Sequence, residues 1–249
     1  PGDVTGISVY DQERKDFVFK PGPVFAHVVL ADEINRATPK TQSSLLEAMQ
    51  ERQVTITGTQ HPLPEPFFVM ATQNPIEMEG TYPLPEAQVD RFLFKLWVQF
   101  PALAELAEIL DRTTGATNPE VQRVCSGEKL LEMNRLSREV VTSAPVREYA
   151  ARLVLATHPD RPEAPPGIRR FVRFGSSPRG AQGLLMAGKV RALTEGRFNL
   201  AFEDIRALAA PTLRHRLILS FEGEAEGIDT DRLIEELLEE VPVEPMQVG

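Results

Sequence analysis

The stretch His27–Ala37 reads HVVLADEINRA, in which the apolar run Val28–Ala31 is followed by two adjacent carboxylates, Asp32 and Glu33. A short, uninterrupted apolar run is typical of a strand that is buried on both faces of a parallel sheet. Ligands of such sheets bind beyond the carboxyl ends of the strands, so both carboxylates stand where a ligand is expected. The same pattern also occurs at ordinary strand ends, and taken alone it leaves the two interpretations evenly balanced.

A second apolar run, Phe67–Thr72, has the same strand-like character and leads into Gln73-Asn74-Pro75. Pro75 has no N–H to donate to a sheet, and we expect it to end the strand. Asn74 then lies at a carboxyl end. If the two strands are parallel, Asn74 shares an edge of the sheet with Asp32 and Glu33.

The charge and composition of the chain exclude several classes of protein. It has 249 residues, is 42% hydrophobic and carries a net charge of −9, which argues against affinity for nucleic acid over the whole chain. Its one cysteine, Cys125, cannot form an internal disulfide. No apolar run reaches the length of a membrane span, and the start of the chain has no signal-peptide pattern. We therefore expect a cytoplasmic protein with no nucleic-acid partner and no membrane span.

The remaining periodicities divide the chain into an α/β part, residues 1–158, and a helical part, residues 168–249. Between them, the sequence PDRPEAPPG at 159–167 predicts a linker. The expected elements of the first part are strand-and-turn material at 3–25, a helix at 39–51, a hairpin at 54–63, a short helix at 85–91, a third strand at 92–98, and helices near 102–111, 128–139 and 145–157. Those of the second part are helices at 178–195, 202–209, 212–219 and 229–240.

Asp32, Glu33 and Asn74 form one candidate cluster for nucleotide chemistry. An aspartate can bind Mg²⁺ through water, a glutamate can polarise an attacking water, and an amide at a strand end can hold that water or a terminal phosphate. The alternative for Asn74 is a turn residue that bonds to local backbone N–H groups.

Two arginines are candidates for phosphate recognition. Arg91 follows Asp90 at the end of the short helix, where it is either a surface ion-pair partner or an arginine finger that reaches the phosphate in a neighbouring subunit. Arg179 lies in the first turn of the helix that Ser177-Pro178 opens. A cation there opposes the helix dipole unless an anion such as phosphate lies in front of it, and the alternative is a solvated arginine.

The stretch Gly183–Lys189 reads GLLMAGK and matches the first seven positions of a phosphate-binding loop. Position 190 is Val, so the Mg²⁺-binding hydroxyl is missing, and the stretch falls in the middle of a predicted helix with no strand before it. We interpret the match as a coincidence, with Gly188 allowing close packing between helices.

The order of the motifs VVLADE, ATQNP, YPLPEAQVDRF and GSSPRG, with LRHRL beyond, resembles the MoxR family of AAA+ ATPases, which is related to the magnesium chelatase ATPase subunits. The resemblance implies an AAA+ P-loop NTPase-type parallel sheet core followed by an all-helical lid. By position, Asp32 and Glu33 resemble the Walker B pair and Asn74 resembles sensor 1. Arg91 resembles the arginine finger and Arg179 resembles sensor 2.

Further implications of this resemblance are ATP and Mg²⁺ as cofactors, a homo-oligomeric ring, usually a hexamer, and chaperone-like remodelling or maturation of partner complexes, often with a von Willebrand factor A domain protein. Family members carry a Walker A loop upstream of the segment that opens this chain, whereas the 249 residues contain none. We therefore expect a carboxyl-terminal part of a longer ATPase that binds ATP poorly by itself. The alternative is a non-hydrolysing interaction or scaffold module derived from such an ATPase.

Overall fold

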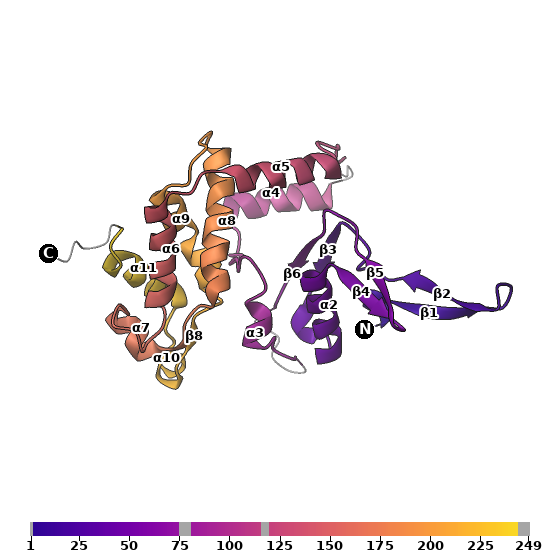
Figure 1. The fold of residues 1–249 in the computed structure, drawn as a ribbon, viewed down its shortest axis with the longest axis horizontal. Helices are drawn as coiled ribbons and strands as arrows, with labels where there is room; N and C mark the ends of the chain where they lie inside the picture. Colours follow the sequence, from indigo (N-terminus) through magenta and orange to yellow (C-terminus); the bar gives the residue numbers. More distant parts are fainter. Residues whose placement is uncertain (1, 75–80, 116–119, 244–249) are drawn as a thin grey trace.

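The computed structural model describes residues 2–74, 81–115 and 120–243. Figure 1 shows an amino-terminal part with strands around α2 (Pro39–Glu51), and a carboxyl-terminal group of helices around α8 (Pro178–Thr194), with the short α3 (Glu86–Val89) between them. In the described part of the chain, no helix has the length and apolar character needed to cross a membrane.

The helices and strands follow one another in a simple order. The amino-terminal part consists of α1 (Gly2–Thr5), β1 (Gly6–Asp11), β2 (Asp16–Pro21), β3 (Val28–Ala31), a 3-10 helix (Ile34–Arg36), α2, β4 (Gln53–Ile56), β5 (Thr59–Pro62), β6 (Phe68–Ala71) and α3. Two helices, α4 (Leu103–Thr114) and α5 (Gly127–Glu139), come next. The carboxyl-terminal part consists of α6 (Ala144–Ala156), α7 (Pro166–Phe171), β7 (Val172–Phe174), α8, α9 (Phe202–Leu213), β8 (Ile218–Leu219), α10 (Phe221–Ala225) and α11 (Thr230–Glu240).

Strands β3 and β6 pair in parallel, as expected, with Val28 opposite Phe68 and Ala31 opposite Ala71. The expectation that β3 is buried on both faces is wrong. One face packs on the amino-terminal apolar cluster through Val29 and Ala31, while the other face leaves the side chains of β3 and β6 at Val28, Leu30, Phe68 and Met70 exposed. The predicted strand stop at Pro75 lies outside the described residues.

Helix α2 begins as predicted, with Pro39 at its first position and Thr38 as the N-cap, whose hydroxyl accepts a hydrogen bond from the Thr41 N–H. Its inner face contributes Leu45 and Ala48 to the cluster beneath the β3–β6 pair. The predicted hairpin is also present as β4 and β5. It lies beside the β1–β2 hairpin, where Phe19 stacks on His61 with ring centroids 3.9 Å apart.

The prediction of a third strand at 92–98 is wrong: this segment is extended coil. Its backbone pairs with the carboxyl-terminal part instead of with a neighbouring strand. The Lys95 N–H donates to the carbonyl of Pro211 at 2.9 Å. The Lys95 and Phe92 carbonyls accept hydrogen bonds from Arg214 and His215, so side chains occupy the groups that a sheet would pair.

One apolar cluster holds the carboxyl-terminal helices together. Its largest fully buried members are Tyr149, Leu153, Ile168, Leu184, Ile205, Leu213, Ile234 and Leu237. Helix α6 belongs to this cluster, and so does Ala164 of the Pro-rich segment 159–167. The boundaries at 158 and 168 stay predictions from sequence, and this packing favours drawing the helical unit from about Ala144 onward.

The helix expected at 212–219 is a second error. Helix α9 runs through Pro211 to Leu213, and a turn then leads to β8, which pairs antiparallel with β7. Short apolar runs do not distinguish a helix from a strand by periodicity alone, which accounts for the misassignment. The turn between α9 and β8 carries Arg214, His215 and Arg216, the residues that hold the segment after α3.

Candidate functional site

The carboxyl ends of β3 and β6 bring two of the predicted site residues together. The Asn74 side-chain amide donates to a carboxylate oxygen of Glu33 at 3.4 Å, across 41 positions of sequence. This contact follows from the parallel pairing of the two strands, because parallel strands present their carboxyl ends at the same edge. The edge that the sequence predicted is therefore formed.

Thr72, which the sequence reasoning did not single out, joins both carboxylate residues at this edge. Its hydroxyl donates to a carboxylate oxygen of Asp32 and accepts a hydrogen bond from the Glu33 backbone N–H at 2.8 Å. Its carbonyl accepts from the Ile34 N–H at 3.0 Å. A hydroxyl-bearing residue two positions before Asn74, at the end of a strand, is the signal that could have identified it.

Glu33 has an unusual backbone conformation. It occupies the left-handed region, with φ 48° and ψ 50°, at the start of the 3-10 helix Ile34–Arg36. Non-glycine residues in this region are uncommon and store strain, and such residues concentrate at functional sites. The Glu33 carboxylate also pairs with the Arg36 guanidinium at 3.0 Å, an exposed contact between residues three positions apart.

A buried amide supports the loop that carries Glu33. The side-chain nitrogen of Gln42 on α2 lies 3.0 Å from the Ile34 carbonyl, 3.2 Å from the Ala37 carbonyl and 2.8 Å from the Tyr82 carbonyl. Gln42 lies on the inner face of α2 among apolar residues, and its buried side chain is polar. Because burying an amide is unfavourable unless it is hydrogen-bonded, this set of contacts fixes the loop in one position.

The donor set at this edge fits a hard divalent cation. Asp32 is exposed, and its neighbours Thr72 and Glu33 offer further oxygen atoms. Mg²⁺ in nucleotide sites is held by one or two carboxylates, water and substrate phosphates, so a single well-placed aspartate is a sufficient protein contribution.

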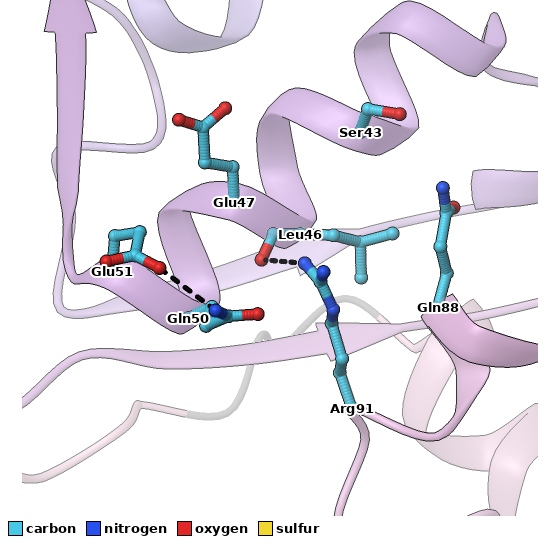
Figure 2. Close-up of a pocket in the computed structure, with 7 residues that line it drawn as sticks. All are labelled: Ser43, Leu46, Glu47, Gln50, Glu51, Gln88 and Arg91. Atoms are coloured by element: carbon cyan, nitrogen blue, oxygen red, sulfur yellow. Dashed lines mark hydrogen bonds between the residues drawn. The ribbon is translucent and has the colours of Figure 1, made fainter.

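Arg91 is not part of this edge. Its guanidinium donates to the Leu46 carbonyl of α2 at 3.1 Å. Figure 2 shows Arg91 reaching toward α2, which carries Glu47 and Glu51, with Gln88 of α3 nearby. These residues line a pocket of about 390 Å³.

Arg179 also makes its hydrogen bonds and its ion pair away from Asp32 and Glu33. It lies in the first turn of α8, whose N-cap is Ser177, and it pairs with the carboxylate of Asp90 at 3.0 Å. Burial alone would raise the pKa of Asp90. The hydrogen bonds from Arg179 and Ser177 and the charge of Arg216 outweigh this effect, so the pKa of this carboxyl group lies below its ordinary value. The sequence therefore located an anion in front of Arg179, but in this structure that anion is a side chain.

The match to a phosphate-binding loop at Gly183–Lys189 lies in the interior of α8, as expected of a coincidence. A Cβ atom on Gly188 would approach Leu200 Cδ1 to 2.6 Å. The glycine therefore permits close contact between α8 and the residue that precedes α9, which confirms the packing interpretation.

Comparison with known families supports the arrangement of both parts. The model of the ATPase family associated with various cellular activities (AAA) matches residues 1–94, and the model of the AAA lid domain matches residues 168–237. A solved structure of a putative ATPase from Cytophaga hutchinsonii superimposes with a TM-score of 0.90 at 41% identity. That match covers 97% of this chain and 74% of the solved chain.

Curated relatives extend over almost the whole chain. YeaC of Bacillus subtilis, which is named as uncharacterized, is 42% identical over 250 residues, covering 99% of this chain and 74% of the relative. Chaperone MoxR1 of Mycobacterium tuberculosis is 42% identical over 241 residues, covering 97% of this chain and 64% of the relative. The motif order, the fold and these relatives agree, and the chain belongs to the MoxR family of AAA+ ATPases.

Proposed function

We propose that this protein hydrolyses ATP in a MoxR-type ring and uses the energy to remodel or mature partner complexes. The contact between Glu33 and Asn74 carries the proposal. A carboxylate and an amide 3.4 Å apart, at the carboxyl ends of paired parallel strands, can together hold and polarise one water molecule.

In this proposal Glu33 acts as the general base and Asn74 orients the attacking water. Asp32 would hold Mg²⁺ through water, and the cation would offset charge on the phosphate oxygens. The Thr72 hydroxyl bonds to both the Asp32 carboxylate and the Glu33 backbone N–H, and it holds these two groups in position relative to each other.

Arg179 and Arg91 supply positive charge from two different subunits. Arg179 would contact the terminal phosphate of its own subunit's nucleotide, and Arg91 would act in trans as the arginine finger of the next subunit. The separation of both arginines from the Glu33 edge is consistent with roles that depend on nucleotide binding and ring assembly. A ring, which we propose to be a hexamer, follows from the role of Arg91.

The remodelling activity rests on the relatives. The name Chaperone MoxR1 supports a chaperone-like function for this chain, and we propose that it acts in the cytoplasm with a partner that carries a von Willebrand factor A domain.

Phosphate release and MgATP titration calorimetry on the complete gene product test the proposal. We expect Mg²⁺-dependent turnover that rises with protein concentration as subunits assemble. Binding of MgATP without turnover at any concentration would instead favour the non-hydrolysing scaffold module. The same titration on the 249 residues alone tests whether they bind ATP poorly, as the missing phosphate-binding loop suggests.

A further inference from the structure

The carboxylate of Asp90 holds two arginines at once. Arg179 Nη1 lies 3.0 Å from one of its oxygens, and Arg216 Nε lies 3.0 Å from the other. The Ser177 hydroxyl is 2.9 Å from both oxygens. Asp90 thus joins the end of α3 to the start of α8 and to the turn after α9.

The two arginines differ sharply in how firmly they are held. The side chain of Arg216 is only 3% exposed, and each of its five N–H groups has an acceptor. These acceptors are the Asp90 carboxylate and the carbonyls of Asp90, Phe92, Leu93 and Thr212. Moving Arg216 would leave a buried charge and several carbonyls without partners, so we regard it as fixed.

Arg179, by contrast, is half exposed, and Asp90 is the one acidic partner of its side chain among the described residues. An ion pair with an exposed partner adds little net stability, because water solvates the freed guanidinium. If Arg179 leaves, Asp90 keeps its pair with Arg216 and its hydrogen bond from Ser177. The buried carboxylate of Asp90 is therefore not left without a partner. The geometry therefore allows one arginine to exchange while the other stays.

We propose that Asp90 is a positioning residue that holds Arg179 in the nucleotide-free protein and releases it to the terminal phosphate when ATP binds. This inference rests on the proposed function, since it needs Arg179 to contact phosphate. Arg216 keeps the Asp90 carboxylate in place throughout, so that Arg179 returns to the same site after product release. Asp90 then competes with the nucleotide for Arg179 and lowers the apparent affinity for ATP.

A double-mutant cycle on the complete gene product tests this competition. The measured quantity is the Kd of a non-hydrolysable ATP analogue with Mg²⁺, for wild type, Asp90→Asn, Arg179→Ala and the double variant. We expect Asp90→Asn to bind about two- to fivefold more tightly, the value of one exposed ion pair. We expect Arg179→Ala to bind more weakly, and Asp90→Asn to have no further effect in that background.

Asp231→Asn is the matched control. Asp231 is partly buried in the same region and pairs with Arg214 at 2.8 Å, whereas Arg179 pairs with Asp90. This control should leave the Kd unchanged. An equal effect of Asp90→Asn in both backgrounds, or weaker binding in the single variant, would overturn the inference while Arg179→Ala still supports the proposed function. An unchanged Kd for Arg179→Ala would remove the proposed role of Arg179 itself, and the inference with it.

A second measurement needs no variant, which matters if Asp90→Asn does not fold. Crystal structures with and without the analogue should show the Arg216–Asp90 contact in both states and the Arg179–Asp90 contact in the nucleotide-free state alone. An Arg179–Asp90 pair that persists beside the bound analogue would contradict the exchange.

Discussion

The carboxylate of Glu33 accepts a hydrogen bond from the side-chain amide of Asn74 at 3.4 Å, at the edge where β3 and β6 both end. The backbone of Glu33 is held in the left-handed region at this point, a conformation that stores strain and that concentrates at functional sites. We therefore expect the chemistry of the site to depend on Glu33 more than on any other residue of this edge.

Glu33→Gln should retain nucleotide binding and lose turnover by about 10²- to 10⁴-fold, because an amide keeps the shape and hydrogen bonding but cannot accept the proton of water. Phosphate release and nucleotide titration on the complete gene product measure the two properties separately. Turnover at the wild-type rate would take the role of general base away from Glu33.

Thr72→Val removes the hydroxyl that joins Asp32 to the Glu33 N–H while preserving the shape of the side chain. We expect turnover to fall about 10- to 100-fold, the usual effect of losing a group that orients a metal-binding residue. Thr72→Ser keeps the hydroxyl and should restore most of the rate. Equal losses in the two variants would show that the methyl group and not the hydroxyl matters.

Arg91→Ala should lower turnover by about 10³-fold or more if its guanidinium completes the site of a neighbouring subunit. Mixed with wild type in increasing proportion, the variant should reduce activity more steeply than dilution alone, because each variant subunit disables a neighbour. Arg112→Ala is the control, since Arg112 pairs with Glu108 on the exposed face of α4. Strictly proportional loss on mixing would argue against action in trans.

The elements that the sequence predicted correctly are those whose signal is local. The apolar runs of β3 and β6, the cap and proline at Thr38-Pro39 and the hairpin at 54–63 each depend on a few neighbouring residues, and all are present. The expected parallel pairing of these two strands places Asn74 beside Glu33, and the structure has this contact.

The errors arise from contacts between residues far apart in sequence. The run FLFKLWV at 92–98 has the composition of a strand, yet its carbonyls are bound by Arg214, His215 and Arg216, about 120 positions away. Likewise, the first turn of α8 indicated that an anion faces Arg179, but nothing local identified Asp90 as that anion. Thr72 was missed because a threonine at the end of a strand is common and its two partners lie 39 and 40 positions away.

Arg216→Met should destabilise the carboxyl-terminal part by about 3 to 5 kcal/mol, the usual effect of removing one partner of a buried ion pair. The variant removes the buried donor to the Asp90 carboxylate and to the carbonyls of Phe92 and Leu93. Asp90 keeps Arg179 and Ser177, and the Phe92 carbonyl keeps His215. Chemical denaturation measures the change in the free energy of unfolding. Arg112→Met, on an exposed surface, serves as the control and should leave it unchanged. If Arg216→Met lowers the free energy of unfolding no more than the control does, the turn after α9 does not stabilise the segment 92–98.

His215 should make the free energy of unfolding depend on pH. Burial of the ring, with the nearby charge of Arg216, lowers the pKa of His215 from 6.5 to about 4. These effects outweigh the hydrogen bond from Nε2 to the Phe92 carbonyl at 3.0 Å, which by itself raises the pKa. The other ring nitrogen, Nδ1, has no partner among the described residues. Between these two values the unfolded chain binds a proton that the folded protein does not, so the free energy of unfolding falls as pH drops through this window.

Titration of His215 should lower the free energy of unfolding by about 3 kcal/mol at pH 4, since each unit of pKa difference corresponds to about 1.4 kcal/mol. His215→Gln can still donate to the Phe92 carbonyl but does not titrate. Between pH 6.5 and 4, the free energy of unfolding of this variant should therefore fall by about 3 kcal/mol less than that of wild type. Denaturant titrations of both proteins across this range measure the difference. Parallel pH profiles would show that His215 has the same pKa in the folded and the unfolded protein, which would contradict a lowered pKa in the folded protein.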